Sequence, residues 1–256
     1  MRRSKFLFIV IAALLLSLSG VANAQEEEPS TFVYATYFEC DVSKQDRVDE
    51  IVKNAWAPVY DAAVEAGTLS SWGWMAHHTG GKWRRVLYYS APGLEALIDA
   101  PEAITPKIKE SHPSAGQTFS EICNAHDDYI WQVGTGSKGA GVISTERGKV
   151  GMSVYFYCDI SEEDRADEIV EDIFAPIYNK HVKEGNLTSW GWLKHYVGGK
   201  WRRVTTTTAT DLKTLMAARK AIFADVNESA EAASKEFGGI CGSHQDYIWT
   251  VVHETP

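Results

Sequence analysis

The chain has 256 residues, of which 45% are hydrophobic and 23% are charged, and its formal net charge is −9 at pH 7. This acidic balance, with no Lys/Arg block beyond two short Lys-Trp-Arg-Arg segments, argues against binding to nucleic acid or to an anionic membrane surface. After residue 24, no apolar run approaches the ~20 residues that a membrane-spanning helix needs.

The first 24 residues have the pattern of a secretory signal peptide. A basic start is followed by an apolar run over residues 6–18 and by the small-residue cleavage site Ala22-Asn23-Ala24. Cleavage would place the mature N-terminus near Gln25 and remove three positive charges, which changes the formal charge from −9 to −12. No cysteine follows the cleavage site to carry a lipid. We therefore predict an exported protein, periplasmic or extracellular, with no membrane attachment after cleavage.

The mature chain contains two copies of one unit. The segment Trp72–Val86 returns as Trp190–Val204, and the same offset of 118 residues relates the other paired positions. Roughly half of those positions are identical and no gap is needed, which indicates a tandem duplication of a small domain. The predicted organisation consists of an acidic leader over 25–31, repeat 1 over 32–133, a Gly-rich linker over 134–149 and repeat 2 over 150–252.

Each unit begins with a predicted strand and an amphipathic helix. In repeat 1 the strand spans Phe32–Cys40, and apolar residues then recur at helical spacing as far as Gly67. Pro58 lies inside that pattern and predicts a kink or break near Ala57, because proline removes a backbone donor and its ring clashes with the preceding turn.

The Trp-rich segment of each unit predicts a β-hairpin. Apolar and aromatic residues alternate on both sides of Gly80-Gly81, and two glycines tolerate the positive φ values of a tight hairpin turn. This turn predicts the pairs His78 with Trp83, His77 with Arg84, Ala76 with Arg85 and Trp74 with Leu87. One face would then carry Trp72, Trp74, His78, Trp83, Arg85 and Tyr89, and the other Met75, His77, Arg84, Val86 and Tyr88.

A second helical region and a last strand complete the unit. The helical region runs from Gly93 to about Glu110 and again over 119–122, with predicted interruptions at Pro101, Pro106 and Pro113. The last strand is Asp128–Val133, and its counterpart is Asp246–Val251. The element order is therefore β-α-β-β-α-β, twice.

This order is that of the ferredoxin-like fold, in which helices cover one face of a four-stranded sheet. The other face is left bare, and two tethered copies can pack these faces together. In element order and duplication, the chain resembles the dimeric α+β-barrel superfamily with both subunits fused. The predicted fold class is α+β, with two ferredoxin-like units packed sheet to sheet as an intrachain barrel, a pseudo-dimer within one chain.

The four cysteines test this topology. In a ferredoxin-like sheet the fourth strand lies antiparallel beside the first, which brings Cys40 near Cys123 and Cys158 near Cys241. Behind a signal peptide these thiols are expected to be oxidised. We predict one disulfide in each repeat. A redox or metal role is the alternative, but no Cys-x-x-Cys spacing supports it.

His77 and His195 are the candidate catalytic residues. Each is expected to face an arginine across the hairpin, and a neighbouring cation lowers the pKa of histidine and keeps the ring neutral, able to act as a base. The competing interpretation is a histidine that is simply hydrogen-bonded within the sheet. His126 with Asp128, and His244 with Asp246, could orient one another, but two ligands fall short of a metal site. We predict neither a metal nor a cofactor.

The aromatic face suggests a ligand site. Its indoles would form core by default, but a buried arginine on that face must find an anion or an aromatic ring. The predicted ligand-binding residues are Trp74, Arg85, Tyr37, Trp192, Arg203 and Tyr155. Packing alone is the competing interpretation. Repeat 2 has a polar run, Thr205–Thr208, where repeat 1 has Leu87-Tyr88-Tyr89-Ser90, which argues against two equal sites.

The first functional hypothesis is an exported protein that binds an aromatic or anionic small molecule in a cavity lined by Trp, Arg and His. The second is an enzyme that uses histidine as acid and base, because the resemblance implies relatives that include cofactor-free oxygenases, isomerases and haem enzymes. The third is a structural or stress-associated protein whose tryptophans only pack. The sequence leaves the ligand and any assembly beyond the pseudo-dimer open.

Overall fold

The computed structural model describes residues 30–138 and 148–255. The predicted signal peptide over 1–24, residues 25–29 of the leader and residues 139–147 of the linker lie outside the described residues. Repeat 1 consists of β1 (Thr31–Glu39), α1 (Gln45–Ile51), α2 (Ala57–Glu65), β2 (Ser71–Thr79), β3 (Arg85–Pro92), α3 (Leu94–Ser111), α4 (Ala115–Ile122) and β4 (Ala125–Lys138). Repeat 2 consists of β5 (Val150–Tyr157), α5 (Glu163–Ile169), α6 (Ala175–Lys183), β6 (Ser189–Val197), β7 (Arg203–Ala209), α7 (Leu212–Ser229), α8 (Glu231–Ile240) and β8 (Ser243–Thr255).

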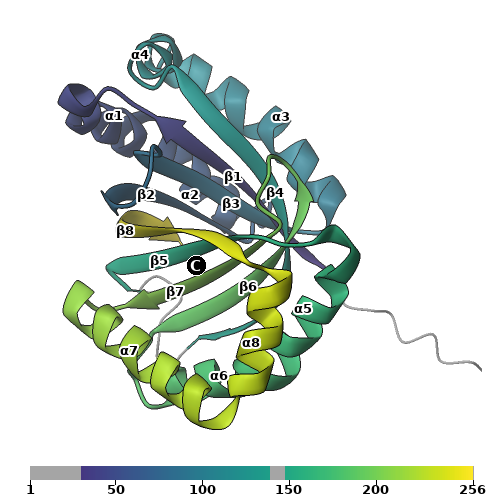
Figure 1. Cartoon of the computed structure of the whole chain (residues 1–256). Helices are drawn as coiled ribbons and strands as arrows, with labels where there is room; N and C mark the ends of the chain where they lie inside the picture. The colour runs from purple at the N-terminus through teal and green to yellow at the C-terminus, as the bar shows by residue number, and fades with distance from the viewer. Residues whose placement is uncertain (1–29, 139–147, 256) are drawn as a thin grey trace, which may run out of the picture.

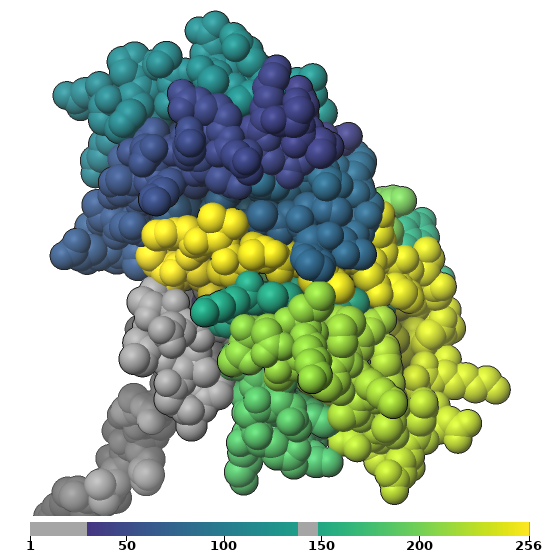
Figure 2. Space-filling view, turned by 90° about the vertical axis from the view of Figure 1, so that its left-hand side faces the viewer, coloured from purple at the N-terminus to yellow at the C-terminus, as the bar shows by residue number. Residues whose placement is uncertain are grey.

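The eight strands form one closed antiparallel barrel in the order β1-β3-β2-β8-β5-β7-β6-β4. Each repeat contributes a ferredoxin-like sheet, and the pairs β2 with β8 and β4 with β6 join the two sheets. Because neighbours alternate in direction around the barrel, β1 and β5 run the same way. The helices lie outside the barrel (Figure 1), and the C-terminal strand fills the seam between the repeats (Figure 2). The predicted fold class is confirmed.

The joining strands are longer than predicted. β4 continues to Lys138, through five residues assigned to the linker, and β8 continues to Thr255. Gly136 lies opposite Gly191, and a Cβ atom on Gly136 would come within 2.5 Å of the carbonyl oxygen of Trp190. The glycines that indicated a flexible linker therefore allow close approach of two backbones.

Two proline predictions had different outcomes. The first helix contains a π-helical turn over Val52–Trp56, and α2 begins at Ala57 with Pro58 in its first turn, which confirms the predicted break. In contrast, α3 continues through Pro101 and Pro106, so the predicted interruptions there are wrong. Both prolines are exposed, while Leu97, Ala100 and Ile104 of the same helix are buried against the sheet. Packing of this apolar face overrides the local helix-breaking tendency.

The buried side chains form two helix–sheet cores and a third core inside the barrel. Each repeat contains one disulfide, Cys40–Cys123 in repeat 1 and Cys158–Cys241 in repeat 2, at positions related by the 118-residue offset. The predicted pairing is confirmed. In the described part of the chain, no helix combines the length and apolar character that crossing a membrane requires.

Candidate functional site

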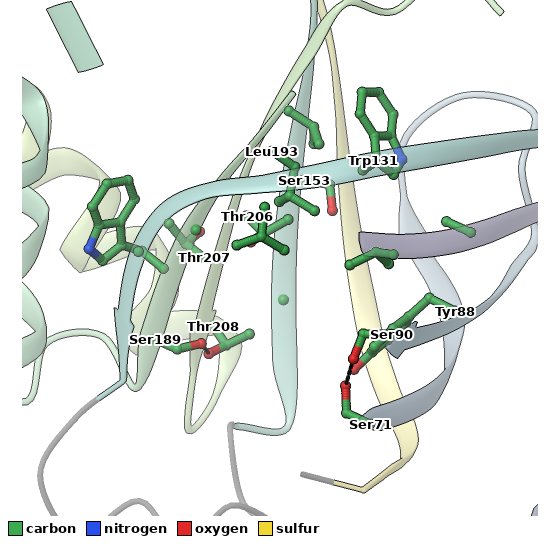
Figure 3. A pocket seen from close by; sticks show the side chains of 18 of the residues that line it. Ser71, Tyr88, Ser90, Trp131, Ser153, Ser189, Leu193, Thr206, Thr207 and Thr208 are labelled. Atoms are coloured by element: carbon green, nitrogen blue, oxygen red, sulfur yellow. Dashed lines mark hydrogen bonds between the residues drawn. The ribbon is translucent and has the colours of Figure 1, made fainter. Parts of the chain in front are cut away.

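The barrel contains a partly open cavity of about 660 Å³. Both repeats line it, with residues of β1, β2, β3 and β4 on one side and of β5, β6, β7 and β8 on the other. It lies toward the end at which β1 and β5 begin, where Ser71, Ser90, Ser189 and Thr208 approach it (Figure 3). This volume is in the range of small-molecule sites in proteins, ~300–1,000 Å³.

Aromatic side chains form the floor of the cavity. Tyr37 and Tyr155 meet edge to face with 5.5 Å between ring centroids, and Trp131 Nε1 donates to Tyr37 Oη at 3.3 Å. Burial raises the pKa of both phenols, and hydrogen bonds only partly offset this effect for Tyr37. Both hydroxyls therefore stay protonated and can only exchange hydrogen bonds. Of the residues predicted to bind a ligand, Tyr37 and Tyr155 line the cavity.

The two sides of the cavity have different chemistry. On β5 and β7, Ser153 lies opposite Thr206 and presents a hydroxyl-rich surface. On β1 and β3, the matching pair is Ala35 and Tyr88. Figure 3 shows Ser153 and Thr206 on one side of the space and Tyr88 on the other.

Tyr88 and Glu254 form a phenol–carboxylate pair at the cavity. The Tyr88 hydroxyl donates to Glu254 Oε1. Both residues lie opposite Gly73, and a Cβ atom there would come within 2.5 Å of the Tyr88 ring. The ring thus crosses β2 where it has no side chain. Sequence reasoning missed Glu254 because the predicted repeat ended at residue 252, although the 118-residue offset pairs Glu254 with Gly136 and could have marked the difference.

Four of the predicted ligand-binding residues lie on the opposite face of the sheet. Trp74 and Arg85 pack under the helices of repeat 1, where the Trp74 indole and the Arg85 guanidinium both donate to Asp49 at 2.7 Å. Trp192 and Arg203 make the same contacts with Asp167 in repeat 2, at distances of 2.7 and 2.8 Å. None of the four is among the residues that line the cavity.

This placement corrects the expected faces of the hairpin, although the predicted register is confirmed by the pairs Ala76 with Arg85 and Trp74 with Leu87. The face that carries Trp72, Trp74 and Arg85 is covered by helices, and the other face lines the barrel. Trp83 also departs from the prediction, because it precedes β3 and stacks on Tyr37 in the barrel core at 4.3 Å between centroids.

His77 and His195 lie behind the floor of the cavity and do not line it. Each ring meets a tryptophan of the floor edge to face, with centroids 6.2 Å from Trp249 and 6.1 Å from Trp131 respectively. Arg84 Nη1 lies 3.4 Å from His77 Nε2, and Arg202 Nη1 lies 2.8 Å from His195 Nδ1. Burial, then the charge of these arginines, lowers the pKa of both histidines. The predicted direction is right, and burial is its larger cause.

The two His-x-Asp motifs form local contacts. His126 Nδ1 lies 3.0 Å from Asp128 Oδ2, and His244 Nδ1 lies 2.8 Å from Asp246 Oδ1. Within residues 30–138 and 148–255, no cluster of three or more His, Cys, Asp or Glu side chains could hold a metal ion. Both contacts lie within the first residues of β4 and β8 and join side chains two positions apart on the same strand.

Known structures share this architecture along nearly the whole chain. An anthrone oxidase-like protein superposes with a TM-score of 0.58 at 15% sequence identity, over 89% of this chain and 93% of that chain. A presumed monooxygenase from Lactobacillus acidophilus gives 0.62 at 6% identity, over 88% and 96% of the two chains. Another from Fusobacterium nucleatum gives 0.60 at 9% identity, over 89% and 94%.

The likeness is one of fold. At these identities the neighbours show a ferredoxin-like α+β barrel and carry no activity over to this chain. No family model matches the sequence, and no curated protein matches it either.

Proposed function

We propose that this protein binds a neutral, largely aromatic small molecule inside the barrel. The observation that carries the proposal is the cavity of about 660 Å³ that combines an aromatic floor with hydroxyl-bearing walls. Ligand sites are typically apolar pockets with a few placed polar groups.

The lining favours a neutral ligand over an anionic one. Arg85 and Arg203 are paired with carboxylates on the helix side, and the described lining residues include no Lys, Arg or His. An anion would lose its hydration there without gaining a cationic partner. The aromatic part of the initial hypothesis therefore keeps its support, and the anionic part has none from the geometry.

The proposal includes export to an oxidising compartment. Two disulfides tie the repeats internally, and such bonds persist mainly in secreted or periplasmic proteins. The signal-peptide pattern of residues 1–24 supports the same location.

The direct test is extraction of protein purified from its native compartment, followed by mass spectrometry of the released small molecules. We expect a neutral aromatic compound in stoichiometric amount. In parallel, calorimetric titration with naphthol and naphthoate should show naphthol binding at least tenfold tighter. No bound compound and no heat with either probe would favour the structural alternative, in which the tryptophans only pack.

Catalysis is the second candidate function, and the Tyr88–Glu254 pair is the observation that favours it. A carboxylate hydrogen-bonded to a phenol beside the cavity could take a proton from a bound substrate, a role that we initially assigned to His77 and His195. Proton abstraction from a bound substrate is the reaction class that this pair supports. The test is to incubate the extracted compound with the protein and look for a new mass. General-base catalysis predicts that Glu254→Gln lowers turnover by about 100-fold or more while binding persists.

A further inference from the structure

The two halves of the cavity can be compared position by position, because the repeats are related by a constant offset. In repeat 2, Ser153, Thr206 and Gly191 lie side by side across β5, β7 and β6. The matching positions of repeat 1 carry Ala35, Tyr88 and Gly73 across β1, β3 and β2. The strand register is equivalent at these positions in the two repeats, so the side chains that stand there can be compared directly.

Two side chains, Tyr88 and Glu254, narrow the cavity on the repeat 1 side. Tyr88 lies over Gly73 so closely that a Cβ atom on this glycine would come within 2.6 Å of the phenol oxygen. The hydroxyl bonds to Glu254 on the neighbouring strand. Together they occupy the volume that a ligand would need on this side.

The repeat 2 half has room at the equivalent place. Thr206 replaces the tyrosine, and a Cβ atom on Gly191 would meet only Thr206 Oγ1, at 3.2 Å, and Leu193 Cδ1, at 3.9 Å. Gly136 of β4 lies opposite Gly191, whereas Glu254 of β8 lies opposite the matching Gly73. Figure 3 shows Thr206 and Ser153 directed into this open side of the cavity.

Hydrogen bonding among the aromatic residues at the floor of the cavity also differs between the two repeats. In repeat 1 the Trp131 indole donates to the Tyr37 oxygen. In repeat 2, Tyr155 has Tyr37 and Ser153 as side-chain hydrogen-bond partners, Ser153 being alanine in repeat 1, and the buried indole N–H of Trp249 has no partner among the described residues. The polar groups at the floor therefore differ between the repeats, and the added hydroxyl, that of Ser153, is on the repeat 2 side.

We propose that the barrel holds a single ligand in the repeat 2 half, with Thr206 as the residue that makes room and Ser153 as the residue that recognises it. The Tyr88 and Glu254 side chains occupy the equivalent position on the repeat 1 side and prevent a ligand from binding there. The ligand class is a flat aromatic molecule with a carbonyl or hydroxyl oxygen on the edge that meets the hydroxyl-rich wall. This inference rests on the proposed function and specifies its site.

The decisive variant is Thr206→Tyr, which installs the repeat 1 residue over Gly191, a glycine that leaves space for the ring. Calorimetric titration with naphthol should give one site in the wild type and an affinity at least tenfold lower in this variant. The matched control is Thr205→Leu, which installs the repeat 1 residue at the adjacent position, outside the cavity lining. Its affinity should stay within twofold of the wild type.

Two further variants keep the test independent of how Thr206→Tyr folds. Ser153→Ala should weaken naphthol binding about fivefold or more and leave the binding of unsubstituted naphthalene unchanged. Tyr88→Thr should open the equivalent place in repeat 1 and change the stoichiometry of naphthol binding from one molecule to two.

The outcomes separate this inference from the proposed function. No binding to the wild type would overturn both. Binding to the wild type with equal affinity for Thr206→Tyr, or a stoichiometry that stays at one in Tyr88→Thr, would overturn the single-site assignment alone.

Discussion

The two repeats share a hydrogen-bonded group where sheet meets helix, and they differ at matched positions of the cavity wall. Under the helices, Trp74, Arg85 and Asp49 form the same hydrogen-bonded group as Trp192, Arg203 and Asp167, with distances that agree within 0.1 Å. Inside the barrel, Ser153 of repeat 2 occupies the position equivalent to Ala35, and Thr206 occupies the position equivalent to Tyr88. The duplicated framework is therefore a stability device present twice, whereas the cavity belongs to neither copy alone and has been shaped by their differences.

Loss of a disulfide should have the largest effect and should affect the repeats equally. Each bridge joins residues 83 positions apart. On the chain-entropy model, Cys40→Ala with Cys123→Ala, or Cys158→Ala with Cys241→Ala, should each lower the free energy of unfolding by about 4–5 kcal/mol. Urea unfolding of the two double variants measures this. A loss below about 1 kcal/mol in one repeat only would break the equivalence of the frameworks.

The buried aspartates should rank next and should reveal a small asymmetry. Asp167→Ala leaves Arg203 buried without its main partner, which typically lowers stability by about 3–5 kcal/mol. The Asp49 side chain is 25% exposed against 8% for Asp167, so water can replace part of what Asp49→Ala removes. We expect a smaller loss for Asp49→Ala in urea unfolding. The exposed Asp46→Ala serves as control and should change stability by less than about 0.5 kcal/mol.

Filling a gap in repeat 2 should give a modest gain. A void of about 30 Å³ between its sheet and helices is lined by Thr205, where repeat 1 has Leu87. Thr205→Leu adds apolar volume there and should raise the free energy of unfolding by about 0.5–1 kcal/mol. Thermal unfolding of this variant beside the wild type measures the gain. A loss of stability would mean that the backbones of the two repeats differ more than their register suggests.

The smallest effect should be a dependence on pH from the two hairpin histidines. Their pKa values are lowered in the fold, first by burial and then by Arg84 and Arg202. Below pH 6.5, which is about the histidine pKa in the unfolded chain, the unfolded chain binds protons that the folded chain does not bind. Stability should therefore decrease as pH falls. Urea midpoints measured from pH 8 to pH 5 should fall less in a His77→Gln, His195→Gln double variant than in the wild type. Equal slopes would place the acid sensitivity elsewhere.

The fold could be predicted from the sequence because its signals are local and occur twice. Hairpin register followed from Gly80-Gly81, the helix break from Pro58, and the cysteine pairs from the β-α-β-β-α-β order. The prolines of α3 were misinterpreted because burial of Leu97 and Ile104 outweighs a local preference. The ends of β4 and β8 were missed because pairing with another strand, and not strand propensity, makes those residues extended.

The candidate site was only half predictable for a physical reason. Alternation along a strand separates residues into two faces but does not say which face the helices cover, and an Arg-Trp face suits either a ligand or a buried aspartate.

By itself, the sequence determined a duplicated, disulfide-tied α+β unit with an aromatic sheet, because periodicity, turns and internal identity are properties of neighbouring residues. Only the tertiary structure decided that Trp74 and Arg85 serve the helix–sheet core and that Tyr88 meets Glu254, 166 residues further along the chain. Closure of the barrel brings such residues together, and the position of the cavity depends on which of them are large.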